Sequence, residues 1–253
     1  MKRAPSSVLR SALFSAGSLT ALALWGTVSL LLFPFPYRAR FAFITAWADF
    51  VVWWLRITCS IDHRVTGLEN IPDESVVVFA KHQSTWETLF LISLFRPQTW
   101  VLKRELLWLP VFGWAVALLR PIAIDRATAR MALKQVLRQG KERLREGTNV
   151  VVFPEGTRIE PGRRGRYGIG GALLAHAARK PLVPVAHNAG RFWPKQGFLK
   201  NPGTVDVVIG PPIDPGHSSV EELRQKAEAW VEDEMSRLDA TWTSSQTSAV
   251  LMS

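Results

Sequence analysis

An uncharged apolar run near the N-terminus is the strongest constraint on how this chain can fold. Residues Ala12–Phe33 are 22 consecutive positions without a charged side chain, and about 20 helical residues cross the hydrocarbon core of a bilayer. The apolar part of a cleaved signal peptide is shorter, about 7–15 residues, and ends at a small-residue site. This run ends instead in the bulky segment Phe33–Tyr37, so we expect a retained, membrane-associated helix.

A second apolar stretch, Phe41–Leu55, follows two prolines that break the helix between the two stretches. It contains tryptophans, which suit the membrane–water boundary. Its 15 residues are few for a span, so we predict a helix that lies in the interface. Basic residues flank the first run equally, namely Lys2, Arg3 and Arg10 before it and Arg38, Arg40 and Arg56 after it. A single span therefore stays open beside a re-entrant hairpin with both flanks in the cytoplasm, and the hairpin is favoured.

The remainder of the chain alternates short strands with helices. Ser75–Ala80 and Asn149–Phe153 are β-branched apolar runs typical of buried strands, and Ala127–Glu146 has helical spacing. Further strands are expected at Pro121–Ile124, Leu182–Ala186 and Thr204–Ile209, and further helices at 84–95, Gly170–Arg179 and Ser219–Leu238. The order predicts an α/β fold: a central, mostly buried β-sheet flanked by helices, with an N-terminal two-helix membrane-associated segment.

This pattern also predicts the divisions of the chain. We expect a membrane anchor or helical hairpin over residues 1–58, an α/β domain over 59–240 and a disordered tail over 241–253. The single cysteine, Cys59, excludes a disulfide within the chain. The net charge is +10, and residues 81–200 hold 21 Lys and Arg against 7 Asp and Glu. Such a basic centre attracts anionic partners such as phosphorylated substrates or lipid headgroups.

The first candidate site is His82 with Glu87, just after the Ser75–Ala80 strand. A histidine at a strand-to-helix turn faces the crevice where α/β folds bind ligands, and near neutral pH it can accept a proton from a hydroxyl. Five residues turn a straight helix by about 500°, so Glu87 reaches His82 only if His82 lies in the turn before the helix. Alternatively, Ser84 and Glu87 form a capping box and His82 is an ordinary polar residue. A nucleophilic Ser84 is a weaker alternative.

The segment His82–Glu87 resembles the His-x4-Asp motif of the glycerolipid acyltransferase family, most closely of its bacterial 1-acylglycerol-3-phosphate acyltransferases. The family has an aspartate where this chain has Glu87. The glutamate keeps the negative charge and adds one methylene group. A second family motif, Lys-x2-Leu-x6-Gly-x12-Arg, is met by Lys103, Leu106, Gly113 and Arg126. The family's Glu-Gly-Thr-Arg motif is met by Glu155, Gly156, Thr157 and Arg158, and its apolar Val-Pro-Val strand by Leu182–Ala186. The resemblance covers about residues 60–215 and the apolar hairpin.

The resemblance implies a reaction and a set of roles. It implies that His82 is the general base, that Glu87 orients it, and that a fatty acyl group passes from acyl-CoA or acyl-carrier protein to the 2-hydroxyl of lysophosphatidic acid. No cofactor beyond the donor and no metal are expected. The residues expected to bind substrate are Lys103, Arg126, Glu155, Gly156, Thr157 and Arg158. The membrane lipid bilayer is the expected partner, and the expected location is the inner membrane with the site on its cytoplasmic side.

Two other functions stay open. The chain could be a sister acyltransferase that acts on another lysolipid, such as a lyso-ornithine lipid, because the motifs are shared. It could also be a non-catalytic adaptor that binds anionic lipid through its basic face. Nucleic acid is the least expected partner, because the basic residues show no recognised pattern of interleaved aromatics and the membrane anchor argues against it. Acyl-chain length, donor preference, oligomeric state and contact between Glu87 and His82 are not determined by the sequence.

Overall fold

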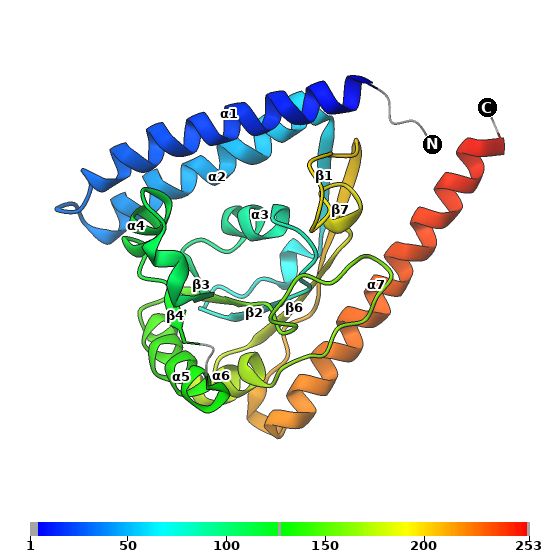
Figure 1. The fold of residues 1–253 in the computed structure, drawn as a ribbon. Helices are drawn as coiled ribbons and strands as arrows, with labels where there is room; N and C mark the ends of the chain where they lie inside the picture. Colours follow the sequence, from blue (N-terminus) through cyan, green and yellow to red (C-terminus); the bar gives the residue numbers. More distant parts are fainter. Residues whose placement is uncertain (1–4, 126–127, 252–253) are drawn as a thin grey trace.

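The computed structural model describes residues 5–125 and 128–251, which fold around a seven-stranded sheet (Figure 1). The strands are β1 (Ile61–Thr66), β2 (Val77–Ala80), β3 (Gln98–Lys103), β4 (Ile122–Ile124), β5 (Asn149–Val152), β6 (Leu182–His187) and β7 (Gly203–Ile209). The α-helices are α1 (Pro5–Leu30), α2 (Tyr37–Cys59), α3 (Trp86–Leu94), α4 (Phe112–Ala117), α5 (Ala129–Arg145), α6 (Gly170–Ala178) and α7 (Val220–Leu251). The short 3-10 helices are η1 (Leu68–Asn70), η2 (Arg104–Trp108), η3 (Ala189–Arg191) and η4 (Pro215–His217).

The strand order of the sheet is β1-β7-β6-β2-β5-β3-β4. All neighbouring strands are parallel except β6 and β7, which pair antiparallel. Every residue of β2, β5 and β6 is buried, because these central strands have neighbours on both sides and helices over both faces. The predicted α/β fold with a buried central sheet is confirmed.

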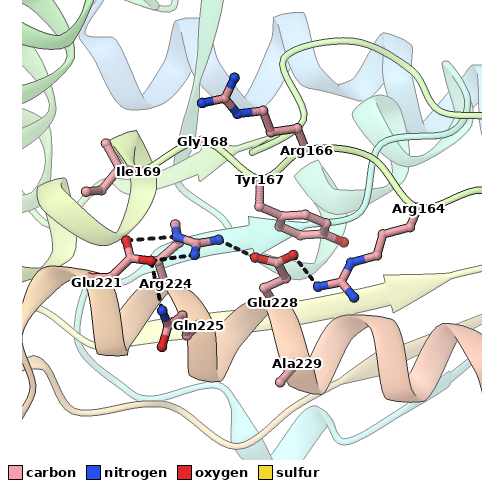
Figure 2. Close-up of a pocket in the computed structure, with 10 residues that line it drawn as sticks. All are labelled: Arg164, Arg166, Tyr167, Gly168, Ile169, Glu221, Arg224, Gln225, Glu228 and Ala229. Carbon is pink, nitrogen blue, oxygen red and sulfur yellow. Dashed lines mark hydrogen bonds and ion pairs between the residues drawn. The ribbon is translucent and has the colours of Figure 1, made fainter.

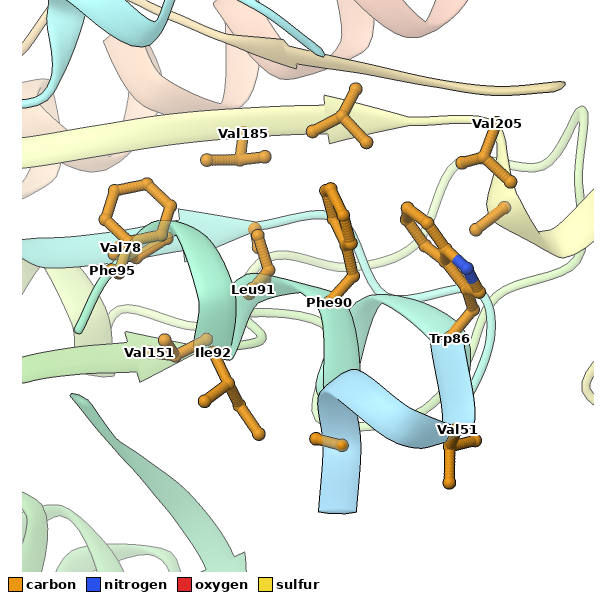
Figure 3. Close-up of a cluster of buried hydrophobic side chains, with 14 of the residues drawn as sticks. Val51, Val78, Trp86, Phe90, Leu91, Ile92, Phe95, Val151, Val185 and Val205 are labelled. Carbon is orange, nitrogen blue, oxygen red and sulfur yellow. The ribbon is translucent and has the colours of Figure 1, made fainter. Parts of the chain in front are cut away.

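Helices cover the two faces of the sheet and form two separate cores. Val78 packs with residues of α2 and α3, whereas Val77 and Phe79 pack with residues of α5, α6 and α7. Figure 3 shows the first core, in which Trp86 and Phe90 of α3 fill the space beneath the sheet. Fully burying one such large apolar side chain stabilises the fold by roughly 1.5–3 kcal/mol. Because parallel strands alternate with these helices, the carboxyl ends of β2, β3, β4 and β5 gather at one edge of the sheet.

The two N-terminal helices form a hairpin that lies along the α/β domain (Figure 1). The indole N–H of Trp25 in α1 donates to the carbonyl of Phe43 in α2 at 2.8 Å. The inner face of α2 is buried at every third or fourth residue, at Phe41, Ile44, Ala48, Val51, Leu55 and Cys59. The hairpin therefore shares its core with the sheet rather than hanging from it on a linker.

Helix α2 is longer than the predicted Phe41–Leu55 stretch. It runs over 23 residues from Tyr37 to Cys59, because the charged ends of Arg38 and Arg56 remain exposed and do not oppose the added turns. By length and composition, α1 and α2 are both apolar enough to cross a membrane.

Two strands were not expected from the sequence. β1 contains Asp62, His63 and Arg64, which obscure its pattern, but it is an edge strand that pairs only with β7. Edge strands tolerate such charged residues because one side of the strand faces solvent. β3 lies between β5 and β4, and its polar residues Gln98 and Thr99 are buried.

The C-terminal helix is also longer than predicted. α7 continues to Leu251, where we expected a disordered tail from residue 241. The segment 219–253 contains neither glycine nor proline to stop the helix. Trp242 also packs edge-on against Phe192, with ring centroids 5.3 Å apart, and lies under the Arg191 guanidinium. These contacts hold the helix on the domain beyond its predicted end.

Candidate functional site

The sequence motifs converge at the carboxyl edge of the sheet. His82 follows β2, Phe153 and Arg158 follow β5, and Lys103 ends β3. All four line one cavity of about 1120 Å³. This is the crevice where open α/β sheets bind their ligands. Motifs that are far apart in the sequence therefore line the same cavity.

His82 and Glu87 are in direct contact. The Nδ1 atom of His82 lies 2.9 Å from Oε1 of Glu87. His82 lies in the turn before α3, whose first residue is Trp86, which is the arrangement that lets two residues five apart meet. The side chain of Glu87 is 1% exposed and that of His82 is 16% exposed. The carboxylate is thus shielded from water, while the imidazole reaches the cavity.

The capping interaction forms as well, through the same carboxylate oxygen. The backbone amides of Gln83 and Ser84 donate to Glu87 Oε1 at 2.9 and 2.8 Å. The Ser84 hydroxyl accepts from the Trp86 amide and donates to the carbonyl of Trp193 at 2.6 Å. Ser84 is therefore a buried capping residue, which disfavours its alternative role as a nucleophile. The two contacts considered for Glu87, with the cap amide of Ser84 and with His82, are therefore both present.

The surroundings of Glu87 keep it ionised. Burial on its own would raise the pKa of Glu87, but the neighbouring His187 and the hydrogen bonds from His82 and the Ser84 amide outweigh it, and that pKa falls. His187 is fully buried, and its Nε2–H donates to the Lys81 carbonyl at 2.8 Å. Burial lowers the pKa of His187, although the neighbouring Glu87 carboxylate opposes this shift, and the buried bond to the Lys81 carbonyl gives His187 a structural role.

The loop after β5 holds the imidazole from its other side. The ring of Phe153 stacks on the His82 ring, with centroids 4.1 Å apart and planes inclined by 20°. The amide of Ile159 donates to the carbonyl of His82 at 2.8 Å. The Glu155–Arg158 motif is thereby attached to the histidine turn.

Glu155 does not occupy the place that the sequence predicted. Its side chain is fully buried and pairs with the Nζ of Lys81 at 3.2 Å instead of lining the cavity. Lys81 is 1% exposed and also pairs with Glu232 of α7 at 2.7 Å. The Tyr167 hydroxyl donates to the same Glu232 oxygen at 2.6 Å. We call Lys81, Glu155, Tyr167 and Glu232 the buried charge cluster. Glu155 turns inward because the buried ammonium of Lys81 needs a counter-charge.

The other predicted substrate contacts lie near the cavity, with one exception. Lys103, Gly156, Thr157 and Arg158 line it, and Gly156 makes the turn at φ +66°. Lys103 is half exposed and pairs with Glu105 at 3.4 Å. Arg126 lies outside the described residues, so its predicted role stays a prediction.

Sequence reasoning missed two basic residues. Lys195, in the loop before β7, lines the cavity, but nothing in its local sequence distinguishes it from a surface lysine. Lys81 directly precedes His82 and directly follows the apolar strand Ser75–Ala80. Its position at the end of a buried strand was the one sequence signal that this lysine is buried. Its partner Glu232 is 151 residues away, so only the fold could reveal it.

The cavity is mainly apolar away from these groups. It runs beneath the hairpin, past Leu22 and Trp25 of α1 and Ile44 of α2, to Leu133 and Val136 of α5. Its volume exceeds the roughly 300–1,000 Å³ of common small-molecule pockets. One end therefore offers polar and basic groups, and the remainder suits a long apolar ligand.

A smaller pocket of about 630 Å³ lies between α7 and the loop before α6 (Figure 2). Four of its charged residues pair with one another: Arg164 pairs with Glu228 at 2.5 Å and Arg224 with Glu221 at 2.6 Å. It contains none of the predicted site residues, so we do not regard it as the site.

Comparison with known proteins agrees with the geometry. The sequence profile of the family described as Acyltransferase matches residues 62–188. A 1-acyl-sn-glycerol-3-phosphate acyltransferase of Pseudomonas aeruginosa is 48% identical over 235 residues, which cover 91% of each chain. A chloroplastic 1-acyl-sn-glycerol-3-phosphate acyltransferase of Arabidopsis thaliana is 31% identical over 84% of this chain and 60% of its own. The crystal structure of the 1-acyl-sn-glycerophosphate acyltransferase from Thermotoga maritima superposes with a TM-score of 0.77 at 28% identity, covering 92% of this chain and 96% of that one.

The buried charge cluster yields a prediction about stability. Lys81→Met leaves Glu155 and Glu232 without their cation, and breaking a buried pair from one side costs about 3–5 kcal/mol. We expect the melting temperature to fall by roughly 6–20 °C, since 1 kcal/mol shifts a chain of this size by about 2–4 °C. Adding Glu155→Gln and Glu232→Gln should restore much of the loss, because no unpaired charge then remains buried.

Thermal unfolding of the detergent-solubilised variants measures this effect, with Lys180→Met as control. Lys180 pairs with the exposed Glu74 at 2.8 Å, and exposed pairs contribute about 0–1 kcal/mol. Burial already raises the pKa of Glu155, so the Lys81→Met deficit should shrink as the pH falls and Glu155 takes up a proton. A triple variant no more stable than Lys81→Met would contradict the interpretation.

Proposed function

The chain belongs to the acyltransferase family, and on that basis we propose that it transfers a fatty acyl group from a thioester donor to the 2-hydroxyl of 1-acyl-glycerol-3-phosphate. The product is phosphatidic acid. The observation that carries the proposal is the His82–Glu87 pair at the polar end of a long apolar cavity. The donor is acyl-CoA or an acyl-carrier protein.

The proposed reaction is one displacement at the thioester carbonyl. Nε2 of His82 takes the proton of the 2-hydroxyl as the oxygen attacks the carbonyl carbon. The carbon–sulfur bond then breaks, and the imidazolium returns its proton to the leaving thiolate. Glu87 holds Nδ1–H and balances the positive charge of the imidazolium, as the aspartate does in catalytic triads. The step needs no covalent acyl-enzyme and no cofactor beyond the donor.

Basic groups at the mouth of the cavity would bind the acceptor phosphate. Arg158 presents a planar fork of donors that suits phosphate oxygens, and Lys103, Lys195 and the Thr157 hydroxyl lie around the same space. No carboxylate pairs with Arg158 among the described residues, which leaves its guanidinium available. Holding the phosphate would orient the 2-hydroxyl toward His82, and such positioning accounts for much of the rate in enzymes of two substrates.

The hairpin would hold the site at the lipid surface. Its outer face exposes large apolar side chains, including Leu9, Leu13, Leu19, Leu24, Leu31, Phe33 and Phe35. Its inner face packs on the α/β domain along the length of α2. A helix bound lengthwise to a polar domain cannot leave it to cross the bilayer, which favours a hairpin embedded in one leaflet. We place that leaflet on the cytoplasmic side of the inner membrane.

The His82→Ala variant tests the proposed function directly. Removing the base should abolish measurable acyl transfer, because general-base catalysis contributes about 10²–10⁴-fold and no other base contacts the acceptor in the proposal. Transfer of labelled acyl groups to 1-acyl-glycerol-3-phosphate is measured in detergent-solubilised membranes. A wild-type kcat in His82→Ala would refute the assignment, and absence of activity in the wild-type protein would refute the function.

Glu87→Gln separates the orienting role from the capping role. The amide oxygen can still accept from the Gln83 and Ser84 amides, so the melting temperature should change little. The neutral side chain no longer stabilises an imidazolium, so kcat should fall by about 10²–10⁴-fold, on the scale of general-base catalysis. Parallel measurement of kcat and melting temperature checks this, and an equal loss of both would indicate that Glu87 is only a cap.

Arg158→Ala tests the phosphate contact. The KM for the lysophospholipid should rise by roughly tenfold or more, as expected for the loss of a charge-assisted hydrogen bond of about 1.5–3 kcal/mol, with a smaller change in kcat. Lys180→Ala removes a basic residue remote from the cavity and serves as control. An unchanged KM in Arg158→Ala, or wild-type activity on a phosphate-free lysolipid, would favour a different acceptor.

A further inference from the structure

Helix α5 carries a row of basic residues along its exposed face. Arg130, Lys134, Arg138, Lys141 and Arg145 are all exposed, and they recur every three or four residues, the spacing that places side chains on one face of a helix. The row spans about 22 Å along the helix axis at 1.5 Å per residue. We call these five residues the α5 basic row.

The opposite face of α5 attaches the helix to the domain. The Gln135 side chain accepts from the Asp125 amide at 2.9 Å, and Gln139 donates to the carbonyl of Ala123 at 3.3 Å. Val136 and Leu144 are buried against the sheet. The basic row therefore points away from the domain and takes no part in its packing.

The α5 basic row is not a typical solvated surface. Within the described part of the chain, none of its five members is paired with a carboxylate. α7 is the internal comparison, because its arginines are paired along the helix: the partly buried Arg224 with Glu221, and the exposed Arg237 with Asp233 and Glu234 (Figure 2 shows the first of these). Like charges at spacing i, i+4 destabilise a helix, and basic residues near its N-terminus oppose the helix dipole. α5 tolerates both effects.

The position of α5 indicates what this charge can meet. Its residues Ala132, Leu133 and Val136 line the cavity that contains His82, so the row borders the cavity wall. The hairpin covers the other face of the sheet, and Figure 1 shows α5 at the end of the molecule away from it. A membrane held by the hairpin is thus on the far side, which disfavours lipid headgroups as the occupant of the row.

We propose that the α5 basic row is the docking surface for an acidic acyl-carrier protein, which presents the acyl group as a phosphopantetheine thioester. The inference rests on the proposed acyl-transfer function and adds the donor's docking surface to it. A carrier on α5 lies beside the cavity wall, and its flexible prosthetic arm delivers the thioester to His82. Charge complementarity of this kind raises the association rate and selects the partner. Acyl-CoA, which lacks the protein, does not need the row.

The test compares two donors with the same acyl chain, acyl-carrier protein and acyl-CoA, on the full-length enzyme in detergent. The variant is the triple Arg130→Gln, Lys134→Gln, Arg138→Gln, because glutamine keeps helix propensity while removing charge. We expect the KM for the carrier thioester to rise about tenfold or more, with kcat/KM for acyl-CoA within about twofold of wild type. The matched control is Arg64→Gln, Lys226→Gln, Arg237→Gln, which removes the same charge from other exposed positions and should change neither donor.

A second measurement needs no variant. Added salt screens exposed charges, so the wild-type KM for the carrier thioester should rise more steeply with ionic strength than that for acyl-CoA. Equal losses with both donors in the triple variant would overturn the inference, as the row would then bind phosphates common to both. A selective loss of binding to anionic vesicles would overturn it in favour of lipid. A wild-type enzyme that uses acyl-CoA but not the carrier overturns the docking surface and leaves the proposed function standing. Absence of turnover with either donor removes both.

Discussion

The arrangement of the site depends on one buried carboxylate oxygen. Oε1 of Glu87 accepts from His82 Nδ1 and from the amides of Gln83 and Ser84, all within 2.9 Å. An ionised carboxylate buried away from water is costly unless donors surround it, so these bonds fix the turn from His82 to Ser84 in one conformation. The capping of α3 and the orientation of the His82 ring consequently depend on the same carboxylate oxygen. A longer glutamate in place of the family's aspartate reaches both groups because His82 lies before the helix and not on it.

Two other parts of the molecule support this turn, the loop after β5 and helix α7. Phe153 and the Ile159 amide attach the loop after β5 to His82. The buried charge cluster joins the residue before His82 to Glu155 in that loop and to Glu232 in α7. Through Lys81, the C-terminal helix is part of the framework of the site although it lies outside the motifs. Buried charges of this kind contribute little net stability, but removing one partner is costly, so they hold the loops in one relative position.

The hairpin helices α1 and α2 also form part of the wall of the apolar cavity. Residues of α1 and α2 face outward as exposed apolar side chains and inward as cavity lining. Under the proposed function, a ligand with long acyl chains would meet apolar surface on the outside of the hairpin and again in the cavity, and only its polar head would reach the basic groups near His82. This accounts for the core that the hairpin shares with the sheet, since a flexibly tethered anchor could not form a cavity wall.

The sequence by itself determined the elements whose signal is local. The central strands β2, β5 and β6 are continuous apolar runs because they are buried on both faces, and the motifs at His82 and Arg158 follow two of these strands, whose ends must meet in a parallel sheet. β1 and β3 escaped prediction because an edge position and buried polar side chains alter their pattern. Tertiary structure alone decided that Glu155 faces Lys81 and not the cavity, that Lys195 reaches the cavity, and that α7 continues past residue 240. The physical reason is that these outcomes depend on charges and rings brought together from distant parts of the chain, and a local pattern contains no information about such partners.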